Sequence, residues 1–441
     1  MVRRLAIVGG GPKAVAIAAK AEVLQEEGLL DCEIHVFESK EIGASWTGRH
    51  GYTDGEQALC TPAEKDLGFP YAEMPGAPEA AEKMMARYSW GTFKASRGYA
   101  DWVDLGRRRA SHREFAEYLM WAFDRSGAAL HLGEVTRLER ARITGRQARE
   151  GWKVEWKEGA GKAQLLGTFF DGVVVTGHGP ARPLGPTNSP RMLDGQRLWT
   201  KRERDRALGL LGTRAVSEDA PLVVIGSGGT AAAVLAWLAR QGHRDLPIYL
   251  LAEQATFYSR GNSVFENRLF SDPTQWKALT HATRKAFFER LTRGVVWDAV
   301  MEELVQLSAL KFIDGRATDI TAAGAGNLTL QWKRNLSQLE LDLGDEETHQ
   351  VEAGLVINAT GFDNWWFLRL LPPGAIPSDR KERADLLERL AHGMGEDLTF
   401  RDGWTLPRLH APFQSMLVGP GFASLLALGD MADRVLRPYM K

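Results

Sequence analysis

Two stretches of the chain share one order: an apolar run, a glycine-rich turn and an alanine-rich segment. The first is LAIVGGGPKAVAIAAKAEVL, from Leu5, and the second is PLVVIGSGGTAAAVLAWLAR, from Pro221. A short apolar run is typical of a buried strand, and a longer alanine-rich segment of a helix. The pattern predicts a strand at 4–8 with a helix at 12–28, and a strand after Pro221 with a helix at 229–241.

A further apolar run follows each predicted helix. CEIHVFES covers 32–39, and LPIYLLAE follows the second helix. Strand, helix and strand in this order form a βαβ unit with parallel strands. The Pro- and Gly-rich stretch at 179–190 predicts a linker between two such units. We therefore expect an α/β fold with two dinucleotide-binding, Rossmann-like domains.

The turns inside these units have the composition of dinucleotide cradles. In Gly9-x-Gly11-x-x-Ala14 the first glycine permits the tight turn, the second admits a pyrophosphate, and the small third residue lets helix pack on strand. Glu38 closes the next predicted strand and suits hydrogen bonds from an adenosine ribose. The loop at Gly226-x-Gly228-x-x-Ala231 repeats the pattern. One such motif is also compatible with a purely structural turn, but two in one chain favour two bound nucleotides.

Composition narrows the possible partners. The net charge is −1 over 441 residues, which favours neither nucleic acid nor an anionic membrane as a partner. Only Cys32 and Cys60 are present, so we expect no disulfide, no zinc or other metal site and a cytoplasmic location. No run of 18 apolar residues occurs, so no membrane span is expected. Glycines interrupt the apolar start at once, which argues against a signal peptide.

Several separated stretches resemble a known family. ASWTGRHGYTDGEQALCTPAEKDL, SHREFAEYLMWA, NSVFENRLFSDP and GPGFASLLALGDMADRVL are similar to segments of the flavin-dependent N-hydroxylating monooxygenases, which include ornithine and lysine hydroxylases of siderophore pathways. The fingerprint F-x-G-x-x-x-H-x-x-x-Y/W of other flavin monooxygenases is not found in the sequence. The resemblance implies FAD on the first loop, NADPH or NADH on the second, and a small primary amine and O2 as substrates.

The resemblance also implies an interrupted domain order. We expect residues 1–190 to form the first part of an FAD domain, residues 191–348 an NAD(P)H domain with a helical substrate-pocket segment, and residues 349–441 the second part of the FAD domain. Members of the family often form homo-oligomers, which is possible here too.

The expected site residues fall into three groups, and we nominate no catalytic side chain. The expected FAD-binding residues are Gly9, Gly11, Pro12, Ala14, Glu38, Trp46, Gly421, Ser424 and Leu425. The expected NAD(P)H-binding residues are Gly226, Ser227, Gly228, Thr230, Ala231, Glu253 and Arg260. The expected substrate residues are Lys65, Asn267 and Arg293.

Three departures from the family pattern bear on specificity. Arg268 stands where the family has an acid, and Thr292-Arg293 where it has a Thr-Asn pair. Glu253 stands where NADPH-dependent members usually carry an arginine; an acid there would repel a 2′-phosphate and favour NADH, unless Arg260 binds it.

The sequence is also compatible with purely structural roles for the predicted site residues and with other functions for the two loops. Lys65 and Arg293 could be ordinary surface charges, and Asn267 could merely cap a turn. Another oxidation on the same scaffold, at sulfur or carbon, or a reductase would use the same two loops. A non-catalytic dinucleotide-binding redox sensor would too.

Overall fold

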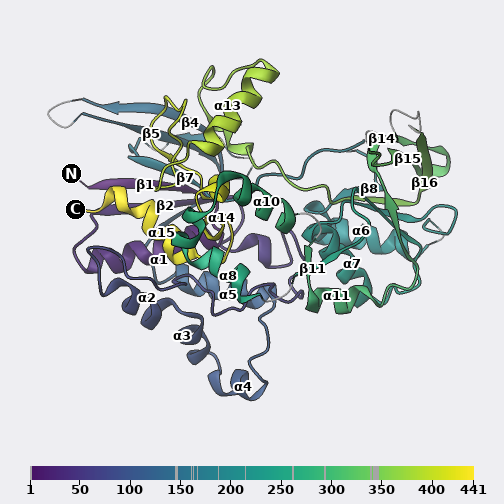
Figure 1. Cartoon of the computed structure of the whole chain (residues 1–441), viewed down its shortest axis with the longest axis horizontal. Helices are drawn as coiled ribbons and strands as arrows, with labels where there is room; N and C mark the ends of the chain where they lie inside the picture. The colour runs from purple at the N-terminus through teal and green to yellow at the C-terminus, as the bar shows by residue number, and fades with distance from the viewer. Residues whose placement is uncertain are drawn as a thin grey trace.

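The computed structural model describes residues 2–144, 148–159, 161, 163–165, 167–186, 188–213, 215–260, 263–292, 295–337, 340 and 347–441. Two five-stranded sheets dominate this part of the chain, one in each half of the molecule (Figure 1). Every strand pair within the two sheets is parallel. The predicted α/β class with two Rossmann-like units is confirmed.

The two sheets share the order of four strands and differ in the fifth, an edge strand that comes last along the chain in the first sheet and first in the second. The first runs β18 (Leu409–His410), β7 (Gly172–Val175), β1 (Arg3–Val8), β2 (Cys32–Glu38), β3 (Ala129–Leu132). The second runs β8 (Met192–Asp194), β17 (Leu355–Asn358), β9 (Leu222–Ile225), β10 (Ile248–Ala252), β13 (Leu310–Asp314). The central strands carry near-continuous apolar runs because both faces of a parallel sheet are covered.

An antiparallel three-stranded meander follows the outermost strand of each sheet. In the first unit it consists of β4 (Glu134–Ile143), β5 (Arg149–Lys157) and β6 (Ala163–Leu165). In the second it consists of β14 (Arg316–Ala322), β15 (Leu328–Lys333) and β16 (Thr348–Ala353). The repeat therefore extends well beyond the two predicted βαβ units.

The helices cover the sheets and connect their strands. The first unit contains α1 (Pro12–Glu26), α2 (Ala80–Tyr88), α3 (Trp90–Ala95), α4 (Tyr99–Asp104) and α5 (His112–Phe123). The second unit and its insertion contain α6 (Lys201–Leu211), α7 (Gly229–Arg240), α8 (Val264–Ser271), α9 (Pro273–Ala278), α10 (His281–Thr292) and α11 (Asp298–Leu304). A short parallel ribbon, β11 (Tyr258–Arg260) with β12 (Val295–Trp297), flanks α11. The C-terminal part contains α13 (Arg380–His392), α14 (Pro420–Ala423) and α15 (Leu428–Leu436).

The chain returns to the first unit later than expected. Strands β16 and β17 belong to the meander and sheet of the second unit, so the predicted boundary at residue 348 falls before two strands of that unit. The return passes through residues 359–363, after β17. Strand β8 enters the second sheet at Met192, next to the other expected boundary at residue 190. Strand β18 and helix α15 complete the first unit.

Candidate functional site

The first glycine loop joins β1 to α1. Gly9 has a φ of 100°, and a Cβ there would lie 2.6 Å from Oγ1 of Thr176, so the position requires glycine. Gly11 caps α1, and a Cβ there would meet nothing within 4 Å. Pro12 occupies the first helical turn, and Ala14 is fully buried against the sheet. Open space therefore faces the unpaired N–H groups of the first helical turn, where a pyrophosphate can bind.

The second loop has nearly the same conformation. Gly226 has a φ of 106°, and a Cβ there would lie 2.5 Å from the carbonyl oxygen of Ala359. Gly228 caps α7 with φ −85° and ψ −173°, against −82° and −173° at the cap of α1. Ala231 is fully buried, Ser227 is buried and Thr230 is half-buried in the first turn of α7. The two loops are thus conformational copies.

The last residue of the second strand, in β2 and in β10, distinguishes the two loops. Glu38 accepts hydrogen bonds from N–H of Gly10, at 2.7 Å, and N–H of Lys40, at 2.8 Å. In the first unit N–H of Gly9 donates to the carbonyl of Phe37, immediately before that glutamate. The carboxylate therefore lies directly beside the first loop.

The matching position in the second unit is Ala252. N–H of Gly226 donates to the carbonyl of Leu251, as N–H of Gly9 does to that of Phe37. N–H of Gly315 donates to the carbonyl of Ala252 at 2.9 Å, as N–H of Gly133 does to that of Glu38 at 2.8 Å. Both hydrogen bonds give the same register, so the second loop has no acid at this place.

Glu253 lies one residue beyond this position. Its side chain is exposed and pairs with Arg316 at 3.7 Å, also at the surface. The middle residue of the loop instead contacts Gln254, through a 3.4 Å hydrogen bond from Oγ of Ser227. The expectation that Glu253 selects NADH therefore loses its structural basis. Arg260 ends β11, and its side chain is outside the described residues.

The carboxyl edges of the two sheets meet where the chain crosses between units. Residues 176–182 follow β7, residues 359–363 follow β17, and the two segments pair antiparallel to each other. N–H of Gly179 donates to the carbonyl of Asp363 at 3.2 Å, and N–H of Arg182 to that of Gly361 at 3.0 Å. Because the parallel strands of each sheet end at this junction, both glycine loops belong to the edges that meet here.

An aromatic cluster fills this junction. The ring of His178 stacks on Phe362, with centroids 4.4 Å apart, and meets Tyr52 and Phe413 edge-on at 4.3 and 5.4 Å. Nδ1 of His178 is buried and finds no hydrogen-bond partner in the described part of the chain. Burial lowers the pKa of this imidazole to about 4, so the ring is neutral at pH 7. The sequence offered only a histidine in a glycine-rich turn as a signal for this position.

The C-terminal turn, residues 419–428, lies between the expected flavin-binding and substrate-binding residues. Its Gly421 lies against the carbonyl of Phe270 in α8, which a Cβ would approach to 2.1 Å. On the other side, N–H of Gly429 donates to the carbonyl of Phe69 at 2.9 Å. Ser424 and Leu425, both half-buried, lie between these contacts. The loop that carries Lys65 and the helix that carries Asn267 therefore pack against one turn.

Lys65 lies on an anchored loop. Its half-buried side chain lies over the ring of Phe69, with Nζ 5.6 Å from the centroid. The neighbouring Asp66 is buried and accepts hydrogen bonds from Tyr71 Oη, at 2.6 Å, and from N–H of Trp90, at 2.7 Å. Burial raises the pKa of Asp66 to about 6 against these hydrogen bonds. Asp66 thus fixes the backbone beside Lys65.

The other predicted residues are placed less decisively. Asn267 is half-buried within α8, where Arg268 is exposed. Trp46 is half-buried and packs edge-on against His112 of α5, with centroids 4.7 Å apart. Arg293 lies outside the described residues. The roles of these residues, like that of Lys65, remain predictions.

The chain's residues fit two dinucleotides. In each loop the second glycine, Gly11 or Gly228, caps a helix, and a Cβ there would meet nothing within 4 Å. Open space therefore lies before both helix N-termini. The buried Nδ1 of His178, which finds no hydrogen-bond partner among the described residues, lies where the two sheet edges meet. A ligand bound at this junction would supply a partner. FAD on the first loop and a nicotinamide dinucleotide on the second satisfy these features.

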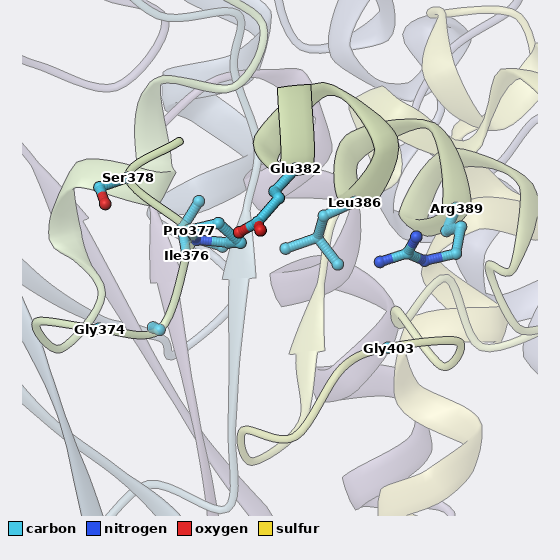
Figure 2. Close-up of a pocket in the computed structure, with 9 residues that line it drawn as sticks. Gly374, Ile376, Pro377, Ser378, Glu382, Leu386, Arg389 and Gly403 are labelled. Carbon is cyan, nitrogen blue, oxygen red and sulfur yellow. The ribbon is translucent and has the colours of Figure 1, made fainter. Parts of the chain in front are cut away.

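A separate cavity of about 710 Å³ lies beside α13 (Figure 2). Glu382, Leu386 and Arg389 of the helix face the loop around Ile376. None of the predicted cofactor or substrate residues lines it. We therefore assign the site by the loops and not by this cavity.

In the part of the chain that the structure describes, no helix has the length and apolar character needed to cross a bilayer. Among the same residues, no group of three or more His, Cys, Asp or Glu side chains is placed to bind a metal ion.

Comparison with known proteins gives a consistent result. Residues 87–364 match the family model described as L-lysine 6-monooxygenase/L-ornithine 5-monooxygenase. The chain is 36% identical to proteins named L-lysine N6-monooxygenase MbtG from Mycolicibacterium paratuberculosis and from Mycobacterium tuberculosis. Each alignment covers 98% of this chain and 94% of the relative.

Solved structures agree on the fold. The lysine monooxygenase NbtG from Nocardia farcinica, which has an NADPH domain, superposes with a TM-score of 0.76 at 32% identity, over all of both chains. The Kutzneria ornithine N-hydroxylase KtzI superposes with a TM-score of 0.73 at 17% identity, covering 100% of this chain and 99% of its own. At that identity the second likeness supports the fold alone.

FAD and NADPH are supported as the cofactors by three observations. The two dinucleotide loops have matching conformations, the two sheet edges meet at the junction, and the relatives match over nearly the full chain. They favour amine N-hydroxylation over the rival oxidations and the redox sensor. The chain belongs to the L-lysine 6-monooxygenase/L-ornithine 5-monooxygenase family and is a flavin-dependent amine N-monooxygenase.

Proposed function

We propose that this protein hydroxylates the side-chain nitrogen of L-lysine, or of a lysine-derived amine, in siderophore or other specialised-metabolite biosynthesis. The observation that carries the substrate is the 36% identity, over 98% of the chain, to proteins named L-lysine N6-monooxygenase. One atom of O2 goes to the nitrogen and the other leaves as water, with two electrons from NADPH. Ornithine is the second candidate, because the family description names both amino acids.

The choice of NADPH over NADH rests on the register of the second unit. At the position of Glu38 the second loop has Ala252, so no carboxylate there opposes a 2′-phosphate. Glu253 is exposed and paired with Arg316, and it makes no hydrogen bond to the loop.

Bound FAD supplies the oxygen chemistry, and the chain supplies placement and dryness. The substrate nitrogen must be uncharged to react, yet a free alkylamine has a pKa near 10.4, so only about a thousandth is neutral at pH 7. Exclusion of water at the aromatic junction of Tyr52, His178, Phe362 and Phe413 favours the neutral amine by desolvation. Lys65 binds the substrate carboxylate, and Asn267 donates a further hydrogen bond.

A panel of amines tests the substrate. The purified protein, saturated with FAD, is assayed for O2 uptake, NADPH oxidation and hydroxylamine formation with L-lysine, L-ornithine and cadaverine. We expect the highest kcat/KM and the tightest coupling with L-lysine. N6-acetyl-L-lysine, whose nitrogen is an amide, should give no hydroxylated product. A higher kcat/KM with L-ornithine would refute the lysine assignment.

The role of Lys65 can be tested with the same panel. Lys65→Met should raise KM for L-lysine by roughly tenfold or more, because it removes a charge-assisted hydrogen bond to the carboxylate. Cadaverine lacks that carboxylate, so its KM should change little. Equal losses with both amines would show that Lys65 does not bind the carboxylate.

A further inference from the structure

The first turn of α1 carries a buried cation that the expected cofactor residues do not include. Lys13 follows Pro12 directly and is only 6% exposed. Its Nζ donates to the carbonyls of Ala423, at 2.9 Å, and Ser424, at 3.3 Å, and lies 5.9 Å from the ring centroid of Phe413. Its polar contacts therefore lie in the C-terminal turn, about 410 residues away.

No carboxylate of the described residues lies within 4 Å of the Lys13 ammonium. Two carbonyls occupy two of its three N–H donors, which leaves one donor and a full charge uncompensated. Burial accordingly lowers its pKa to about 8. A buried charge without a partner is costly, so an anionic ligand would remove this cost.

Lys20, on the same face of α1, provides the contrast. It lies seven residues on and is also buried, but its Nζ pairs with Asp433 of α15 at 2.8 Å. One buried lysine of the helix thus has its counter-charge within the chain. The other has none and lies at the helix end that faces a dinucleotide pyrophosphate.

We propose that Lys13 donates its remaining N–H to a phosphoryl oxygen of bound FAD and, through Ala423 and Ser424, couples cofactor binding to closure of the C-terminal turn. The pyrophosphate supplies the missing negative charge. The turn then stays fixed between the loop of Lys65 and helix α8, so FAD occupancy orders both walls of the proposed substrate site. This inference rests on the assignment of FAD in the proposed function.

The test compares Lys13→Met with Lys20→Met in protein stripped of FAD. Lys13→Met should raise the Kd for FAD, measured by quenching of flavin fluorescence, at least tenfold. It should raise the Kd for ADP-ribose by a similar factor, because ADP-ribose carries the pyrophosphate without the flavin ring. The apoprotein Tm of Lys13→Met should lie above that of Lys20→Met, because only the second change strands a buried carboxylate. Hydrogen exchange at residues 419–428 should slow on FAD addition in the wild type, and much less in Lys13→Met.

Three results would overturn the inference. An unchanged Kd for FAD in Lys13→Met removes the contact. A raised Kd for FAD with an unchanged Kd for ADP-ribose would mean that the Lys13 charge lies against the flavin ring and not against the pyrophosphate. Equal protection of residues 419–428 in both proteins removes the coupling. If Lys13→Met does not fold, Lys13→Gln replaces it, since it keeps N–H donors and loses the charge. A wild type that binds no FAD would refute the cofactor assignment of the proposed function, which is a separate failure.

Discussion

The two sheet units of this molecule share four strands in the same order and differ in their edge strand and their surroundings. Their glycine loops match in φ and ψ, and even the glycine that opens each meander matches. A Cβ at Gly133 would lie 2.7 Å from Trp156, and one at Gly315 would lie 2.5 Å from Trp332. The difference lies in what closes each loop. Glu38 and the C-terminal turn close the first, whereas Ala252 and exposed residues border the second.

This difference suits a cofactor that stays and a cofactor that leaves. The first loop is enclosed by a segment that returns from the other end of the chain, so release of its nucleotide requires that segment to move. The second loop has no such cover among the described contacts. We therefore expect two cradles of matching conformation to differ in nucleotide exchange because their neighbouring segments differ.

The largest expected effect follows from removing the buried ion pair between Lys20 of α1 and Asp433 of α15. Lys20→Met leaves Asp433 buried without a partner, which should lower the free energy of unfolding by about 3–5 kcal/mol. Lys201→Met removes an exposed pair with Asp205 on α6 and should change stability little. Chemical denaturation of both variants measures the difference. Equal stability would mean that α15 does not clamp α1.

Loop substitutions should separate the two units functionally. Gly9→Val and Gly226→Val each introduce strain at positive φ and a contact of 2.6 or 2.5 Å, together about 2–5 kcal/mol. Gly9→Val should yield protein without bound flavin. Gly226→Val should retain FAD but lose roughly 100-fold in its rate of reduction by NADPH. Flavin absorbance and stopped-flow reduction measure these outcomes, and loss of FAD from both variants would contradict the separation.

A single substitution in the second unit should copy the first. Ala252→Glu places a carboxylate at the position of Glu38, where it should repel a 2′-phosphate and accept hydrogen bonds from a ribose. We expect the ratio of kcat/KM for NADPH over NADH to fall roughly tenfold or more.

The matched control gives the smallest expected effect. Glu253→Ala removes an exposed side chain paired only at the surface, so the same ratio should change by less than about threefold. A larger change here than in Ala252→Glu would show that the register argument is wrong.

Local patterns in the sequence predicted the parts of the fold that depend on neighbouring residues. The strands, glycine loops and helices at both units follow from apolar runs, glycines and helix-forming residues within some 20 positions. The meanders were harder to recognise, because alternating polar and apolar strands carry a weaker signal and their pairing is non-local. For the same reason β17 lies beyond the expected boundary at residue 348: it joins the second sheet only through its pairing with β8 and β9.

The sequence by itself determined that two dinucleotide cradles exist, since each is built from consecutive residues whose backbone needs are visible in glycine positions. Tertiary structure alone decided which residue borders each cradle. Hydrogen-bond register puts Ala252, and not Glu253, at the position that corresponds to Glu38, and a contact spanning nearly the whole chain gives Lys13 its partners. Such choices depend on how distant segments pack, because a shift of one residue along a strand turns a side chain to the other face.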